Sequence, residues 1–382
     1  MSVDVQELAT APERDELVRL RRDFHAHPEL GYEEVRTSGI VAARMNELGY
    51  DVRTGIAKTG VIASKGSGER TLYVRADMDA LPILEENDVS YRSQNEGKMH
   101  ACGHDAHTAI AMVAAQRFAD GNFPGRLCFG FQPAEEGGNG ADLMIDEGGL
   151  DGVDAALGLH VWNSMPVGIV GVTPGPAMAA VDTFSVHVKG YGGHAAVPDE
   201  TDDPLVKAAS IVTDLQTIVS RRISPLDAAV VTVTKIEGGT AFNVIPDSAT
   251  LWGTVRTFDE GVRDRIHRMM QEIIGERGTL EIEKVTKVLN NDARMCEIVH
   301  EHAAAIVGEK NVTTDERTMG GEDFASVLAT VPGCFFFVGS AVPDGSFPHH
   351  HPRFDIDERV LSLGLEIMTR SARTYLERGF RT

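Results

Sequence analysis

The pattern of hydrophobic residues changes near residue 180, and this change constrains the fold more than any other feature. From about residue 13 to 176, short apolar segments alternate with helical patterns. We predict strands at 71–76, 126–131 and 155–159. Buried strands separated by helices are typical of an α/β layer with a largely parallel sheet.

After residue 180, hydrophobic and polar residues alternate, as in a strand with one face exposed to water. Pro204 follows Asp203, a good N-cap, and begins a helical pattern. The remaining expected elements are strands at 229–236 and 248–256, a helix containing Val262 and Ile273, and a strand at 280–285. This order, β-α-β-β-α-β, is that of a ferredoxin-like unit.

The α/β pattern returns after about residue 290, with a buried strand at 335–338 and a closing helix. The ferredoxin-like unit is therefore expected to be an insertion. A chain of 382 residues also exceeds the usual size of one hydrophobic core. We predict a discontinuous α/β domain (1–178 and 291–382) and an inserted α+β domain (179–290).

The charge of the chain argues against two classes of partner. With 57 acidic and 36 basic residues, its formal net charge is −21, which disfavours nucleic acid and anionic lipid. Residues 1–17 lack the pattern of a secretory signal, and no apolar run approaches the roughly 18 residues of a membrane helix. Four scattered cysteines do not suggest a disulfide framework. We therefore expect a cytoplasmic protein.

Two segments carry possible metal ligands or acid–base groups. The segment 99–107 reads Met-His-Ala-Cys-Gly-His-Asp-Ala-His, which places Cys102 and His104 just before a helix. Thiolate and imidazole suit zinc, cobalt, nickel or manganese. Glu135 and Glu136 directly follow a strand, where extended backbone would point one carboxylate at a metal and the other at water. Incidental loop polarity and an acidic surface turn remain alternatives for these segments.

Two further segments add imidazoles. His160 ends the predicted strand 155–159, where α/β folds often present active groups. Three histidines at 349–351 lie between two prolines that restrict the backbone. Together the four segments supply enough donors for two divalent ions. One thiolate and one carboxylate would leave such a centre at about +2, which favours an anionic substrate.

As a set, these motifs resemble the peptidase M20 amidohydrolases, in particular the aminoacylase, hippurate-hydrolase and auxin-conjugate-hydrolase branch. The resemblance spans nearly the whole chain. It rests on the segments already quoted and on further segments at 21–30, 75–82, 159–162, 190–195, 238–246, 320–324 and 350–354.

The resemblance implies a set of metal ligands with Cys102 as the bridge between two ions. The implied ligands are Cys102, His104, Glu136, His160 and His350. His350 is chosen over its neighbours because it lies two residues before the proline of an H-x-P-x-F pattern. Asp77 or Asp79 is expected to orient a ligand from behind, and the choice between them stays open.

The resemblance also implies the catalytic groups. Glu135 would accept a proton from the attacking water and deliver it to the leaving nitrogen. His194 and Asn243, both in the inserted domain, would bind substrate and stabilise the oxyanion. Glu322 is expected to contact substrate. The inserted domain would serve as a lid and as the interface of a homodimer or larger homo-oligomer, with His194 acting in cis or in trans.

The predicted function is hydrolysis of the amide bond of N-acyl amino acids. A metallo-carboxypeptidase or dipeptidase at the same centre is the close alternative, with a short peptide as substrate. A cysteine hydrolase using Cys102 would leave Glu135, Glu136 and His350 unexplained. A non-catalytic metal-binding dimer would have no need of Glu135.

Overall fold

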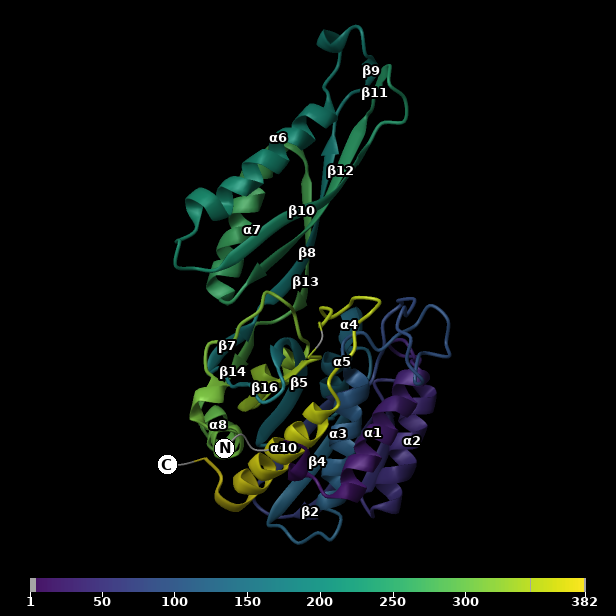
Figure 1. Ribbon diagram of the computed structural model, residues 1–382. Helices are drawn as coiled ribbons and strands as arrows, with labels where there is room; N and C mark the ends of the chain where they lie inside the picture. Colours follow the sequence, from purple (N-terminus) through teal and green to yellow (C-terminus); the bar gives the residue numbers. More distant parts are fainter. Residues whose placement is uncertain (1–4, 344, 381–382) are drawn as a thin grey trace. The chain divides into compact units, whose positions relative to one another are not determined.

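The computed structural model describes residues 5–343 and 345–380, which form two compact units (Figure 1). Unit 1 contains Met1–Gly175, Asn290–Glu316 and Ser326–Thr382. Unit 2 contains Pro176–Leu289 and Arg317–Ala325. The predicted α/β class is confirmed. The boundaries of 178 and 290 stay predictions for domains that would fold independently.

Unit 1 is built on an eight-stranded sheet in the order β1-β2-β4-β3-β5-β16-β6-β15. The strands are β1 (Asp51–Ile56), β2 (Gly60–Ser67), β3 (Thr71–Asp77), β4 (Gly125–Gln132), β5 (Ala155–Pro166), β6 (Val170–Gly171), β15 (Val312–Thr313) and β16 (Gly333–Ala341). The central strands β4, β3, β5 and β16 are parallel. The pairs β1–β2, β2–β4 and β16–β6 are antiparallel. The sheet is thus mixed and only its centre matches the largely parallel sheet we expected.

Helices cover this sheet. They are α1 (Ala11–Ala26), α2 (Val35–Glu47), α3 (His104–Arg117), α4 (Glu135–Gly138), α5 (Gly140–Asp146), α8 (Ala293–Val307), α9 (Phe324–Thr330), which begins in unit 2, and α10 (Arg359–Arg378). In α3, all residues from His104 to Ala115 are buried, as expected of a helix that is apolar around its circumference. It packs against α1 and α10, which lie beside it in Figure 1, and against β3. The start of α3 is therefore held rigidly, and Cys102 and His104 lie there.

Unit 2 has the predicted ferredoxin-like topology. Its elements are β8 (Ala180–Lys189), α6 (Pro204–Thr217), β10 (Ala229–Gly238), β12 (Ser248–Thr257), α7 (Glu260–Ile274) and β13 (Thr279–Thr286). The strands form an antiparallel sheet in the order β10-β12-β8-β13. The carboxylate of Asp203 accepts the backbone N–H of Leu205, and so caps α6 as expected. Asp259 caps α7 in the same way.

Several short elements complete the description. They are β7 (Gly175–Met178) paired with β14 (Leu289–Asn291), β9 (Gly193–His194) paired with β11 (Val244–Ile245), and the helical turns η1 (Val5–Leu8), η2 (Pro198–Glu200), η3 (Ile218–Arg222), η4 (Gly275–Arg277) and η5 (Glu309–Asn311). Within the described residues, no helix combines the length and the apolar character needed to cross a membrane.

Candidate metal centre

The donor-bearing segments meet at one edge of the sheet of unit 1. Asp77 ends β3, and Glu135 follows β4 closely; these strands run parallel. Carboxyl ends of neighbouring parallel strands lie at the same edge, which explains why segments far apart in the sequence converge. His160 lies inside β5, which continues to Pro166. The expectation that it ends the strand was therefore wrong.

The structure brings all five predicted ligands together in two groups that share Cys102. The donor atoms of Cys102, His104 and His160 lie within 4.8 Å of one another. So do those of Cys102, Glu136 and His350. The Cys102 Sγ is 3.4 Å from the His160 Nε2, and the Glu136 Oε1 is 3.1 Å from the His350 Nε2. A soft sulfur shared by two groups is the geometry that a bridging ligand requires.

Two donor atoms at this centre are buried and make no hydrogen bond of suitable geometry to the described residues, although the Glu136 Oε1 lies 3.1 Å from the His350 Nε2. They are the His104 Nε2 and the Glu136 Oε1. The Nδ1 of His104 lies 2.9 Å from the carbonyl oxygen of Asp79 and donates to it, which leaves Nε2 as the nitrogen that could bind a cation. Buried polar atoms normally have partners, because an unsatisfied one loses its hydration without compensation. The residues present thus fit a cation in this position.

The electrostatics of the centre also suit a cation. Burial, followed by the Glu136 carboxylate, raises the pKa of the Cys102 thiol well above its usual value. Burial lowers the pKa of His160 well below its usual value, and His107 and His349 add to this effect. Burial opposes a charge on His104, but the Asp77 carboxylate and Cys102 raise its pKa well above normal. A divalent ion would replace the protons of Cys102 and His104 and would accept the neutral imidazole of His160.

Asp77 and Asp79 are both buried but make different contacts. Asp77 pairs with the Arg75 guanidinium and with the Nδ1 of His107, each at 2.6 Å. Its carboxylate is also 3.5 Å from the His104 Nε2. Asp79 accepts the backbone N–H of Glu136 at 2.9 Å and contacts the Nδ1 of His104. Asp79 therefore contacts two predicted ligands on the side away from their donor atoms.

His350 differs from the two histidines beside it. The Nε2 of His349 lies 2.9 Å from the carbonyl oxygen of Val161, and its ring packs against Trp162. The ring of His351 stacks on Phe347. Only the His350 side chain, which is 52% exposed, belongs to a candidate donor group in the described structure. This arrangement agrees with the motif-based choice of His350.

Glu135 lies close to the predicted ligands but not on extended backbone, as we had expected. It begins the short turn α4, where Ala134 and Gly137 have positive φ and Glu136 has ψ of 67°. The turn lets both adjacent carboxylates approach the Nε2 of His104, from which the Glu135 Oε2 is 4.0 Å away. A carboxylate beside the ligands, with 12% of its side chain exposed, can exchange protons with a water there.

The other three predicted site residues belong to unit 2. His194 and Val244 are paired in the β9–β11 ladder, and the N–H of Ala195 donates to the carbonyl of Asn243. His194 and Asn243 are therefore neighbours, and both are exposed. Glu322 is buried and accepts the backbone N–H of Phe324. Their roles stay predictions.

One group at the centre had no role in our sequence interpretation. His107 donates to Asp77, and its Nε2 accepts the backbone N–H of Val161. The donor atoms of Asp77, His104 and His107 form a further cluster within 4.8 Å. The i, i+3 spacing of His104 and His107 on one helix was the signal that could have indicated this contact.

Comparison with known proteins identifies relatives over most of the chain. The signature described as Peptidase family M20/M25/M40 matches residues 73–374. The chain is 39% identical over 374 residues to the N-acetyl-L-cysteine deacetylase of Bacillus subtilis, covering 95% of this chain and 88% of the relative. It is 36% identical over 375 residues to thermostable carboxypeptidase 1 of Saccharolobus solfataricus, covering 94% of each.

A solved structure matches over both units. The YXEP protein of Bacillus subtilis, described as a dinuclear metal binding peptidase, has a TM-score of 0.82 and 34% identity, covering 96% of this chain and 99% of that one. The family signature, the relatives and this structure together show that the chain belongs to Peptidase family M20/M25/M40 and is a hydrolase that acts on amide bonds.

Proposed function

We propose that this hydrolase removes the acyl group from N-acyl amino acids at a dinuclear metal centre. The observation that carries the proposal is the pair of donor groups that share the Cys102 sulfur. Cys102, His104 and His160 would hold one ion, and Cys102, Glu136 and His350 the other. The mixed set of sulfur, nitrogen and oxygen donors suits zinc, manganese, cobalt or nickel.

Bound there, the ion pair would polarise the amide carbonyl and acidify a water molecule. The reaction then needs a proton carrier, and Glu135 is the candidate. Its carboxylate would take a proton as the water oxygen attacks the carbonyl carbon. It would give that proton to the amide nitrogen as the C–N bond breaks, releasing a carboxylic acid and an amine.

The charge of the centre favours a substrate with a free carboxylate. Two divalent ions with one thiolate and one carboxylate leave about +2, and this positive charge lies in a chain whose net charge is −21. An N-acyl amino acid carries one carboxylate beside its amide. The name of the Bacillus relative, an N-acetyl-L-cysteine deacetylase, supports this substrate class.

We further propose that His194 and Asn243 donate hydrogen bonds to substrate and that Glu322 contacts it, with unit 2 as the lid of a homodimer. His194 and Asn243 are adjacent and exposed. Most of the exposed large hydrophobic side chains among the described residues also belong to unit 2, and Phe242 beside Asn243 is fully exposed. Exposed apolar side chains of this kind are typical of a subunit interface.

Peptide cleavage at the same centre is the second candidate, because one similar relative is named a carboxypeptidase. Parallel kinetics on N-acetyl or benzoyl amino acids and on dipeptides would separate the two substrate classes. A cysteine hydrolase is disfavoured, since burial raises the pKa of Cys102 and keeps its thiol protonated in the absence of a cation.

The decisive experiment compares Glu135→Gln with Glu136→Gln. We expect Glu135→Gln to lower kcat by about 10²- to 10⁴-fold, because the proton carrier is lost, while both ions stay bound. Glu136→Gln is the matched control and should lose metal. Metal content would be measured beside turnover on an N-acyl amino acid panel. Wild-type activity that survives complete chelation would rule out the proposal.

A further inference from the structure

The His350 loop, which we define as residues 347–355, carries its predicted ligand on a disfavoured backbone. His350 has φ of +66°, a conformation that non-glycine residues adopt only when their surroundings hold them there. Its N–H donates to the carbonyl of Ala101 at 2.8 Å. The imidazole is half-exposed, so packing alone does little to fix it.

Asn163 links the two ends of this loop. Its side-chain Nδ2 donates to the carbonyl of Phe347 at 3.1 Å and to the carbonyl of Asp355 at 2.8 Å. Its Oδ1 accepts the hydroxyl of Ser340 at 2.5 Å, which fixes the orientation of the amide. Asn163 is 6% exposed and lies on β5, three residues after His160. One strand therefore carries one predicted ligand and fastens the loop that carries another.

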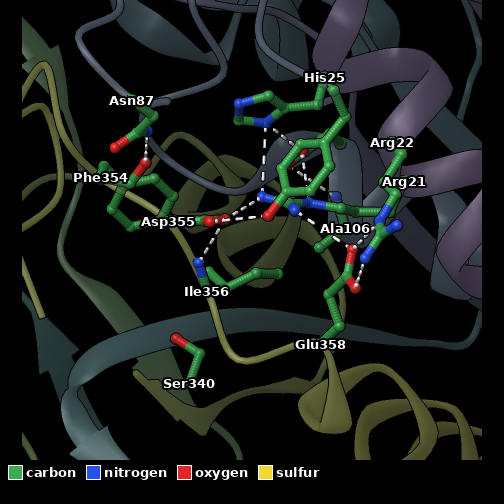
Figure 2. Close-up of polar contacts among 12 residues, drawn as sticks. Arg21, Arg22, His25, Asn87, Ala106, Ser340, Phe354, Asp355, Ile356 and Glu358 are labelled. Atoms are coloured by element: carbon green, nitrogen blue, oxygen red, sulfur yellow. Dashed lines mark hydrogen bonds and ion pairs between the residues drawn. The ribbon is translucent and has the colours of Figure 1, made fainter. Parts of the chain in front are cut away.

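Other contacts hold the downstream end of the loop. The carboxylate of Asp355 accepts hydrogen bonds from Arg21 at 2.6 Å and from Tyr91 at 2.8 Å, and the first is drawn in Figure 2. Asn87 donates to the carbonyl of Phe354, as Figure 2 also shows. With this end fixed, the bond from Asn163 to Phe347 ties the upstream end to it.

We propose that Asn163 is a positioning residue for His350: its side-chain amide closes the loop 347–355 and holds the imidazole toward Glu136. The proposal rests on the ligand assignment of the proposed function. An alanine at 163 would leave the part-buried carbonyls of Phe347 and Asp355 without this donor. The loop would then relax from the conformation in which the His350 Nε2 is 3.1 Å from the Glu136 Oε1.

Asn291 provides a matched control. It is 3% exposed, donates to the carbonyls of Thr173 and Phe335 at 2.9 Å each, and accepts the N–H of Phe335 at 2.7 Å. It thus has the same residue type, burial and number of side-chain hydrogen bonds as Asn163. None of these bonds involves the His350 loop.

The test is a calorimetric titration of the metal-free full-length protein with Zn²⁺. The variants are Asn163→Ala, Asn291→Ala, His350→Ala and the double variant Asn163→Ala/His350→Ala. We expect Asn163→Ala to weaken one of the two ions by about 10- to 100-fold, as loss of a ligand-orienting contact does. Asn291→Ala should leave both affinities unchanged. The double variant should bind no more weakly than His350→Ala, because Asn163 acts through that imidazole.

The outcomes distinguish the two proposals. The role of Asn163 is refuted, and the ligand set stands, if His350→Ala lowers the affinity for an ion but Asn163→Ala does not. The same holds if the losses of affinity in the two single variants add in the double variant. If His350→Ala binds both ions as wild type does, the ligand assignment fails and the role of Asn163 with it. If Asn163→Ala does not fold, Ser340→Ala is the milder substitute, and it should weaken the binding of the same ion.

Discussion

At the scale of single residues, the two aspartates behind the centre have separable tasks. Asp77 neutralises the buried Arg75 and holds His107, whereas Asp79 contacts the residues that carry two predicted ligands. Leaving a buried arginine unpaired costs folding free energy, while releasing a ligand from its support costs metal affinity. We therefore expect Asp77 to contribute mainly to stability and Asp79 mainly to metal binding.

We therefore predict different losses for Asp77→Asn and Asp79→Ala. Asp77→Asn should lower the free energy of unfolding of the metal-free protein by about 3 to 5 kcal/mol, the range for a broken buried ion pair. Asp79→Ala should weaken metal binding by about 10- to 100-fold. Urea unfolding and metal titration of both variants measure these effects. Equal losses of stability in the two variants would contradict the division.

The five predicted ligands could be named from the sequence because the resemblance assigns each of them to a short motif with chemically specific side chains. The contacts of His107 and Asn163 could not be named in this way, because their partners Asp77, Phe347 and Asp355 are distant in the sequence, and the spacing of His104 and His107 indicated only a shared helix face. The extended backbone expected at Glu135 was also wrong. The positive φ of Ala134 starts a turn there, and a local pattern gives no sign of it.

At the scale of elements, a buried ion cluster fastens α7 to β8 in unit 2. Asp182 on β8 pairs with Arg263 and with His267, the latter at 2.6 Å. Burial raises the pKa of Asp182, but the hydrogen bonds from His267 and Arg263 outweigh it and lower the pKa below its usual value. A carboxyl with a lowered pKa stabilises the fold above the pKa of its unfolded form, about 3.9, and loses this contribution as the pH falls through the folded pKa.

We expect Asp182→Asn to destabilise the protein by up to about 3 kcal/mol at pH 7, because the buried Arg263 loses the carboxylate of Asp182 and keeps only that of Glu260. The difference between wild type and variant should shrink as the pH falls below about 4, because the unfolded chain binds a proton there that the folded Asp182, with its lowered pKa, takes up only at a lower pH. Urea midpoints measured from pH 7 to pH 3 would test this. A difference that stays constant over that range would count against the assignment.

Two glycines give a packing test within unit 1. A Cβ at Gly130 on β4 would lie 1.9 Å from the hydroxyl of the buried Tyr73, so Gly130→Ala should destabilise by about 1 to 3 kcal/mol through overpacking. A Cβ at Gly39 on α2 meets no atom within 4 Å. Gly39→Ala should therefore stabilise the helix by about 0.5 to 1 kcal/mol. Opposite shifts in thermal midpoint are expected.

The elements of unit 2 were predictable because caps and alternating strands agree along the sequence. The strands β1 and β2 were not predicted. Most of β1 is exposed, and neither strand alternates clearly between apolar and polar residues. β1 forms one edge of the sheet and β2 lies between it and β4, and these antiparallel pairs, together with β16–β6, make the sheet mixed.

At the scale of the whole molecule, all five predicted ligands belong to unit 1. They come from positions 102, 104, 136, 160 and 350, so bound ions would link segments separated by up to about 250 residues of chain. An ion that binds only the folded state adds roughly 2.7 kcal/mol to the free energy of unfolding when its free concentration is about 100 times its Kd.

Chelation should therefore lower the unfolding temperature of unit 1 and leave the behaviour of unit 2 unchanged. Calorimetry with and without metal would measure the shift. Asp182→Asn, which destabilises unit 2, identifies the part of the unfolding transition that belongs to unit 2. A shift that vanishes in His350→Ala or Cys102→Ala would trace it to the centre. A chelator effect of equal size in a variant that binds no metal would show that it arises elsewhere.

We expect the two proposed ions to bind cooperatively, because Cys102 belongs to both donor groups. The first cation to arrive must displace the proton from a thiol that its buried surroundings keep neutral. A later one meets a sulfur that is already anionic. Binding of one ion should therefore favour binding of the other, and chemical modification of the Cys102 sulfur should abolish the binding of both.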